Sequence, residues 1–295
     1  MNILLTGAWG SAKEYMAQLE EMGHHVAFLQ QEKEALPVPG DWVEGVVGNG
    51  LFLYHAIEQF PNLRYIQLTS AGFDRVPMDY IKQHHIEIHN ARGVYSVPMA
   101  EFAVAGVLTL YKQMRFFEGN QRACKWEKHR GLLELSGKTV CVVGCGSVGS
   151  ECAKRFTAFG CRVIGVDLSP YENEIYEQML PLNQLDEVLH ESDVIVLTLP
   201  LTEETRHMID SRRLAELKDT AVLVNIARGA VIDPAALEQY ISHIGGAVLD
   251  VFEEEQLSAE SPLWDADNVI VTPHNSFVGE GNQKRLSDVI ITNLK

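Results

Sequence analysis

Short apolar runs alternate with amphipathic stretches along most of the chain. In the first third, runs at 2–6, 26–30, 44–47, 65–69 and 86–89 predict strands, and 11–22 has the spacing of a helix. The alternation resumes at residue 138 and continues through runs at 162–166, 193–199, 221–225, 247–251 and 269–272. Strands separated by helical segments are typical of βαβ units, so the pattern predicts parallel sheets with crossover helices.

One segment between these two regions has a different pattern. From Pro98 to about Gly119 the sequence is apolar on more than one helical face, and a proline suits the first turn of a helix. A surface helix needs only one apolar face, so we expect part of this long helix to contact a second subunit. The domain hinge is expected near 92–98, and residues 121–135 are predicted to form an extended connection.

The segment 138–167 contains the most specific motif. An apolar run ends in GCGSVG (144–149), a helical pattern follows, and a second apolar run ends at Asp167. In a dinucleotide-binding unit such glycines allow a tight turn, a close approach of the pyrophosphate and close helix packing, while the helix N-terminus binds phosphate. Asp167 stands where a carboxylate accepts hydrogen bonds from a ribose diol. No Arg or Lys follows it to neutralise a 2′-phosphate, so the motif predicts NAD(H) rather than NADP(H).

Composition narrows the class of protein. The 295 residues are 46% hydrophobic and 22% charged, which fits two globular domains, and the formal net charge of −16 argues against a nucleic-acid partner. The five cysteines form no C-x-x-C motif or metal-ligand spacing, so we expect a reduced cytoplasmic protein with no metal. The N-terminus lacks the pattern of a signal peptide, and no apolar run approaches 18 residues, so no membrane span is expected.

Three polar residues follow predicted strands of the second half, namely Arg228, Glu255 and His274. Taken singly, each is more often a solvated charge or a structural histidine. Beside a nicotinamide they have the chemistry that reduction of a 2-keto acid requires. Arginine binds a carboxylate, protonated histidine donates a proton to the carbonyl oxygen, and a neighbouring carboxylate stabilises the imidazolium. A small-residue loop after the run at 65–69 is a further candidate ligand site, because ligands of open α/β sheets bind at the carboxyl ends of strands.

With these residues in place, the sequence resembles the D-isomer-specific 2-hydroxyacid dehydrogenases. The resemblance rests on GCGSVG and on the stretches 199–209, 225–233, 249–257 and 261–274, which occur in the order of that family. It implies two doubly wound parallel-sheet domains, a Rossmann NAD-binding domain at 96–275 and a flavodoxin-like substrate domain at 1–95 joined by 276–295. It also implies interconversion of a small 2-keto acid and a D-2-hydroxy acid. We expect a homodimer.

The resemblance also assigns site residues. It implies that Arg228 binds the substrate, that His274 and Glu255 form the acid/base pair, and that the loop Ser70-Ala71-Gly72 binds the substrate carboxylate. The residues expected to contact the cofactor are Gly144, Gly146, Ser147, Val148, Gly149, Asp167, Leu199, Pro200, Thr205, Ile226, Ala227, Arg228, Asp250 and His274.

Some positions depart from the family pattern, although none removes a catalytic group. Gln256 stands where a proline commonly follows the catalytic glutamate, and Thr198 stands where many relatives have histidine. A non-catalytic NAD(H)-sensing scaffold of the same fold is the alternative function. Retention of Arg228, Glu255 and His274 together argues against that alternative.

Overall fold

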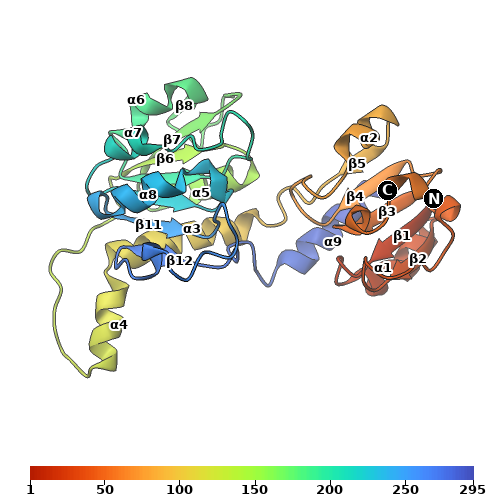
Figure 1. The fold of residues 1–295 in the computed structure, drawn as a ribbon, viewed down its shortest axis with the longest axis horizontal. Coiled ribbons are helices and arrows are strands. Elements are labelled where there is room, and N and C mark those ends of the chain that lie inside the picture. Colours follow the sequence, from red (N-terminus) through yellow and green to blue (C-terminus); the bar gives the residue numbers. More distant parts are fainter. The chain divides into compact units, whose positions relative to one another are not determined.

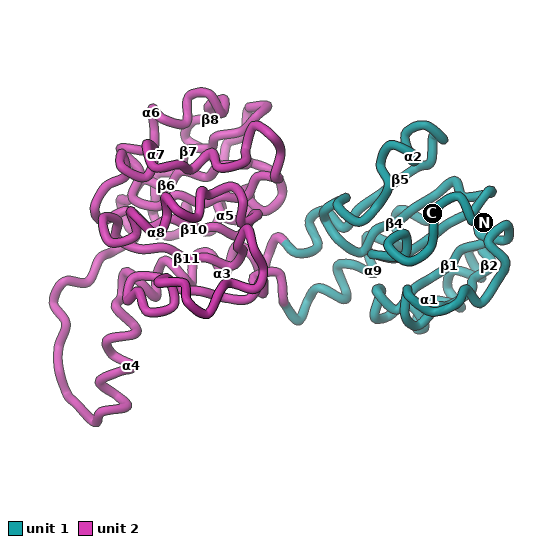
Figure 2. The backbone as a smooth tube through the Cα atoms, in the orientation of Figure 1, with its two compact units in different colours: residues 1–95, 279–295 teal, residues 96–278 magenta.

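The computed structural model describes residues 1–295 and divides into two compact units (Figures 1 and 2). Unit 1 contains Met1–Tyr95 and Gly279–Lys295, and unit 2 contains Ser96–Val278. The chain therefore leaves unit 1 after Tyr95, within the expected hinge, and returns to it at Gly279. The return falls three residues later than the sequence suggested.

Unit 1 is built on a five-stranded parallel sheet of strand order β2-β1-β3-β4-β5. This is the flavodoxin-like order. Every strand lies within one residue of its predicted range, because buried parallel strands are continuous apolar runs bounded by polar residues. The strands are β1 Asn2–Thr6, β2 His25–Leu29, β3 Gly45–Gly48, β4 Tyr65–Leu68 and β5 Glu87–His89.

The C-terminal segment is part of the core of unit 1. Its helix α9 (Asn282–Asn293) buries Leu286 and Ile290 in the same cluster as Ile3 and Leu5 of β1. Trp9 is fully buried, and its indole N–H donates to Ser287 Oγ at 2.9 Å. The other helices are α1 Ala12–Glu21 and α2 Met78–Gln83, with 3₁₀ turns at Gly40–Trp42, Leu51–Leu53 and Ile57–Gln59.

Unit 2 is built on a seven-stranded parallel sheet of order β12-β11-β10-β9-β6-β7-β8. Counted within the unit, this is the Rossmann order 3-2-1-4-5-6 extended by one strand. The edge strand β8 was not predicted from the sequence. The strands are β6 Thr139–Val143, β7 Arg162–Asp167, β8 Gln178–Pro181, β9 Val194–Leu197, β10 Val222–Asn225, β11 Gly246–Leu249 and β12 Val269–Val271.

Helices cover this sheet, and two separate clusters of buried apolar side chains include residues of its strands. None of the helices has the length and apolar character that a membrane span requires. The helices are α3 Ser96–Tyr111, α4 Met114–Arg122, α5 Ser147–Ala158, α6 Leu185–Leu189, α7 Ser211–Ala215 and α8 Pro234–Tyr240, with 3₁₀ turns at Leu182–Gln184, Gly229–Val231, Ile241–His243 and Pro262–Trp264.

The long helix predicted from Pro98 to about Gly119 is broken. Gln113 has a φ of 51° in the left-handed region, so α3 ends at Tyr111 and α4 begins at Met114. The apolar residues of α3 pack within unit 2. A Cβ on Gly106 would lie only 2.6 Å from Val248 of β11. Much of the surface that suggested a second subunit is therefore core. By contrast, α4 has no buried residue and projects from the rest of unit 2 (Figure 1).

Candidate active site

The glycine-rich loop after β6 has the geometry of a phosphate site. Gly144 has a φ of 95°, and a Cβ there would lie 2.6 Å from the Leu199 nitrogen. A Cβ on Gly149 would lie 2.0 Å from the Gly144 carbonyl oxygen, whereas one on Gly146 would meet nothing within 4 Å. No side chain caps α5, so no side chain of the protein accepts the first N–H groups of this helix, from Ser147 onward. These features fit a pyrophosphate at a helix N-terminus.

Asp167 lies beside this loop at the end of β7. Its Oδ2 accepts a hydrogen bond from the Cys145 N–H at 2.6 Å, and its Oδ1 accepts one from the Ser169 N–H at 3.0 Å. A carboxylate has lone pairs beyond these two bonds, which leaves acceptor capacity for a diol. The next residues, Leu168 to Pro170, bring no positive charge. The carboxylate thus fits a ribose and would repel a 2′-phosphate.

The turn after β9 holds three residues expected to contact the cofactor, of which the resemblance assigns Pro200 and Thr205 to the adenosine half. Leu199 is buried against Gly144, and Pro200 is exposed. Thr205 is buried, and its hydroxyl donates to the Pro200 carbonyl and accepts from the Thr202 N–H, both at 2.8 Å. Thr205 therefore fixes the shape of this turn. Its contact with the adenosine half stays a prediction.

The three candidate catalytic residues follow neighbouring parallel strands. Asn225 at the end of β10 is in register with Leu249 of β11, which is in register with Val271 of β12. Arg228, Glu255 and His274 come after these three strand ends. The carboxyl ends of parallel strands lie at one edge of a sheet, so the residues share the edge at which ligands of open α/β sheets bind.

Glu255 and His274 form a direct pair. His274 Nδ1 lies 3.0 Å from Glu255 Oε1 and 3.2 Å from Oε2. Both side chains are about half exposed, and Nε2 of His274 has no protein partner. A carboxylate on Nδ1 fixes the ring orientation and favours the protonated imidazole. The remaining nitrogen is then available to exchange a proton with a ligand.

Asp250 holds the loop that carries His274. Its carboxylate is buried and accepts from the Thr272 hydroxyl at 2.6 Å, the Asn275 N–H at 2.7 Å and the Ser276 N–H at 2.9 Å. Its carbonyl accepts the N–H of His274 at 2.7 Å. His274 has a φ of 51°, a conformation uncommon for residues other than glycine, and these bonds hold it there. The resemblance implied that Asp250 contacts the cofactor, which stays a prediction, and this supporting role was missed.

A second buried polar side chain shapes the loop of Arg228. Asn225 Nδ2 donates to the Arg228 carbonyl at 3.0 Å, and its Oδ1 accepts from the Ala227 N–H at 3.1 Å. The Arg228 guanidinium donates to the Ala227 carbonyl at 2.7 Å. Ile226 and Ala227 are buried below the loop. The N-x-x-R spacing is the sequence signal for this loop, although the role of the asparagine was not inferred from it.

In unit 1, the loop Ser70-Ala71-Gly72 is held through its oxygens. The Ala91 N–H bonds to the Ser70 carbonyl at 2.9 Å, Asn90 Nδ2 to the Ala71 carbonyl at 2.6 Å, and Ser70 Oγ to the Gly72 carbonyl at 3.1 Å. The three backbone N–H groups of the loop donate to no atom of unit 1. The carbonyl oxygens of this loop are already hydrogen-bonded, whereas its N–H groups are not. The loop is therefore suited to binding an anion through its N–H groups.

Comparison with known proteins identifies the family. Residues 104–276 match the NAD-binding domain of the D-isomer specific 2-hydroxyacid dehydrogenases. A glyoxylate reductase of Thermofilum pendens (strain DSM 2475 / Hrk 5) is 33% identical over 79% of this chain and 71% of its own length.

Solved structures show the same fold over nearly the whole chain. A D-isomer specific 2-hydroxyacid dehydrogenase family protein from Aeromonas salmonicida subsp. salmonicida A449 superposes with a TM-score of 0.83 at 28% identity, covering 99% of this chain and 94% of its own. A D-lactate dehydrogenase from Aquifex aeolicus, solved with NAD and lactic acid, gives 0.77 at 28% identity over 99% and 94% of the two chains. The chain belongs to the D-isomer specific 2-hydroxyacid dehydrogenase family of NAD-dependent oxidoreductases.

Proposed function

We propose that the protein reduces a small 2-keto acid to the D-2-hydroxy acid and catalyses the reverse oxidation. Bound NADH supplies the hydride. His274 donates the proton to the carbonyl oxygen from Nε2, while Glu255 stabilises the imidazolium through Nδ1. In the reverse direction neutral His274 accepts the hydroxyl proton.

The His274–Glu255 pair is the observation that carries this proposal. A carboxylate on one ring nitrogen with the other nitrogen unpartnered is the arrangement of a general acid/base. A purely NAD-sensing protein has no need for a buried aspartate that holds a histidine in a left-handed backbone conformation. We therefore prefer the enzyme to the scaffold.

The proposed substrate contacts are made by one charged side chain and by backbone N–H groups. In unit 2, Arg228 binds the carboxylate and the carbonyl oxygen, because a guanidinium forms paired hydrogen bonds with planar oxygen groups. In unit 1, the N–H groups of Ser70, Ala71 and Gly72 are proposed to bind a carboxylate. Unit 1 is accordingly the proposed substrate domain.

The cofactor contacts remain those expected from the sequence, with the pyrophosphate at Gly144–Gly149 and the ribose diol on Asp167. The bond from Cys145 to Asp167 supports this proposal, because it ties the diol acceptor to the phosphate loop. A preference for NAD(H) over NADP(H) follows from the charge of Asp167.

The experiment is a turnover assay. NADH oxidation is measured with glyoxylate, hydroxypyruvate, pyruvate and bulkier 2-keto acids, and glyoxylate is the first to test because a relative is named a glyoxylate reductase. Turnover of at least one of these acids is expected. Binding of NADH without turnover of any of them would favour the sensing scaffold.

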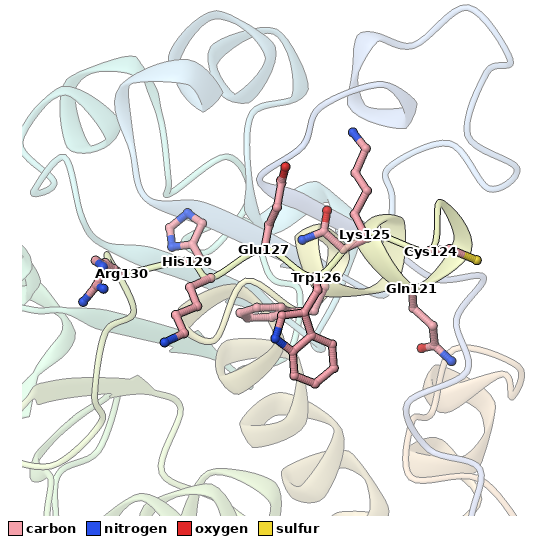
Figure 3. A pocket seen from close by; sticks show the side chains of 10 residues that line it. Gln121, Cys124, Lys125, Trp126, Glu127, His129 and Arg130 are labelled. Carbon is pink, nitrogen blue, oxygen red and sulfur yellow. The ribbon is translucent and has the colours of Figure 1, made fainter.

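We also propose a homodimer, now placed on α4 and the segment 123–130 rather than on α3. Trp126 is 98% exposed, and side chains of this arm line a hollow of about 860 Å³ (Figure 3). Hydrogen bonds from Arg115 to the Ala266 and Asp267 carbonyls join α4 to the rest of unit 2, but the helix buries no residue there. A helix this short is marginal in water without packing, so a further contact would stabilise it. The arm carries Arg122, Lys125, Lys128 and Arg130, whereas the whole chain has a net charge of −16. A second copy of this acidic chain is therefore the proposed partner.

A cytoplasmic location stays part of the proposal. The five cysteines are all free thiols, and four of them are buried. A reducing compartment is the simplest setting for a protein with five thiols and no disulfide.

A further inference from the structure

The loop that carries Glu255 contacts the core through Phe252 and Leu257, which flank the glutamate, and it also borders a hollow. Residues of this loop, among them Phe252, Glu254 and Leu257, line a hollow of about 430 Å³ whose other wall includes Asn225 and Gly229. A catalytic carboxylate must be held within a few tenths of an ångström of its partner to be effective. Packing of Phe252 and Leu257 holds the two ends of the loop, and the position of the carboxylate between them depends on the contacts of the intervening residues.

Glu253, two residues before Glu255, makes two charged contacts. Its Oε1 accepts from Arg206 Nη1 at 2.6 Å, and its Oε2 lies 2.7 Å from His207 Nε2. The pKa of the Glu253 carboxyl is held below its ordinary value, first by the hydrogen bond from His207 and then by the neighbouring charges of His207 and Arg206. The side chain of Glu253 is 29% exposed, less than either partner.

The segment that follows Arg206 is itself hydrogen-bonded to the loop of Arg228. The His207 N–H donates to the Ala230 carbonyl at 2.7 Å, and the Ile209 N–H donates to the Val231 carbonyl at 3.1 Å. His207 has a φ of 50°, so its backbone is held in the left-handed region at the point where its side chain meets Glu253.

The two loops also touch through backbone. A Cβ on Gly229, the residue after Arg228, would lie 1.8 Å from the Phe252 carbonyl carbon and 2.2 Å from the Glu253 nitrogen. Only glycine allows this approach. The loop of Glu255 thus packs directly against the loop of Arg228 at Gly229. It is also linked to that loop by the contacts of Glu253 with Arg206 and His207.

From these contacts we propose that Glu253, Arg206 and His207 form a clamp that positions Glu255 on His274. Glu253 is a positioning residue and does not touch the reacting atoms. The inference rests on the proposed function, because it assigns a support to the acid/base pair. It extends the proposed active site by three residues that support the acid/base pair.

The test compares Glu253→Ala with Glu254→Ala. Glu254 is the adjacent carboxylate, it is exposed and makes no hydrogen bond or ion pair, so its variant removes the same charge from the same loop without touching the clamp. Glu253→Ala is expected to lower kcat for keto-acid reduction by about ten- to a hundredfold, the scale of a misplacement of about 1 Å, with the KM for NADH unchanged. Glu254→Ala is expected to stay within about twofold of wild type. Glu253→Gln, which keeps the shape and one acceptor oxygen, should recover part of the loss.

A double variant separates positioning from a direct charge effect. If Glu253 acts through Glu255, then Glu253→Ala added to Glu255→Gln should cost little further activity, because residues acting as one unit are not additive. The same loss in both backgrounds would overturn the proposal. So would wild-type kcat in Glu253→Ala.

A measurement that does not depend on turnover can test the clamp even if the protein does not catalyse the proposed reaction. Amide hydrogen exchange of residues 252–258 should be faster in Glu253→Ala than in wild type, and unchanged in Glu254→Ala. Faster exchange in an inactive protein would retain the clamp and reject the reaction. Unchanged exchange would reject the clamp, whatever the turnover assay shows.

Discussion

Nδ1 of His274 lies 3.0 Å from Oε1 of Glu255, across two loops that follow the neighbouring strands β11 and β12. The pair orients the imidazole and leaves Nε2 without a protein partner. This relationship joins a backbone feature, the left-handed φ of His274, to the proton transfer that we propose.

Replacing Glu255 with glutamine tests what the carboxylate does for the imidazolium. The carboxylate orients the imidazole through Nδ1 and carries the charge that stabilises the imidazolium, whereas the neutral amide of glutamine carries none. A hydrogen bond to a charged group contributes about 1.5–3 kcal/mol, so kcat for keto-acid reduction by Glu255→Gln should fall by about ten- to a hundredfold. An unchanged kcat in a variant that still binds NADH would rule out the pairing, and Glu254→Gln serves as the control.

Replacing Asp167 with alanine tests the cofactor preference. The change removes both the acceptor for the ribose diol and the charge that repels a 2′-phosphate. Discrimination against NADP(H), measured as the ratio of kcat/KM for NADH and NADPH, should fall by about tenfold or more, which is about 1.4 kcal/mol. A wild-type protein that already prefers NADPH by that factor would show that our cofactor assignment is wrong.

Replacing Asp250 with alanine tests the support of the His274 loop. The change leaves the Thr272 hydroxyl and two backbone N–H groups without their acceptor in a buried site. Unfolding free energy should fall by about 2–4 kcal/mol, as for loss of a buried charged acceptor. The kcat for reduction should fall with it, whereas Asp250→Asn should lose less of both. An unfolding free energy within about 0.5 kcal/mol of wild type would contradict this role.

Replacing Trp126 with alanine tests the dimer. Sedimentation of the wild-type protein at micromolar concentration should show a dimer, and Trp126→Ala should raise the dissociation constant by at least about tenfold, because a central tryptophan contributes strongly to an interface. Trp264→Ala is the control, since Trp264 is also exposed in unit 2 but lies outside the arm. A monomeric wild-type protein would overturn the proposal.

The sequence predicted the strands and the nucleotide loop well. Continuous apolar runs specify buried parallel strands, and three glycines at this spacing followed by Asp167 are specific to a dinucleotide-binding unit. The three catalytic candidates were selected for a related reason, since each lies in a loop that follows such a run, and their roles stay predictions. The pattern of apolar runs was therefore enough to predict the fold class and the edge of the sheet at which the candidate site lies.

Features that depend on distant contacts were not predicted. The break after Tyr111 arises from the left-handed Gln113, a residue with no strong signal for that conformation. The apolar faces of α3 were attributed to a second subunit, because periodicity cannot distinguish intramolecular from intermolecular burial. No role was predicted for Glu253, because its partners lie 46 and 47 positions away in the sequence.

The most direct test of the central claim is kcat for keto-acid reduction by His274→Ala, measured with NADH affinity on the same preparation. General acid catalysis typically contributes about 10²–10⁴-fold, so kcat should fall by that factor while the Kd for NADH stays nearly unchanged. His243→Ala, an exposed histidine before β11 at the opposite end of the strands, should behave as wild type. Undiminished kcat in His274→Ala would contradict the proposed mechanism.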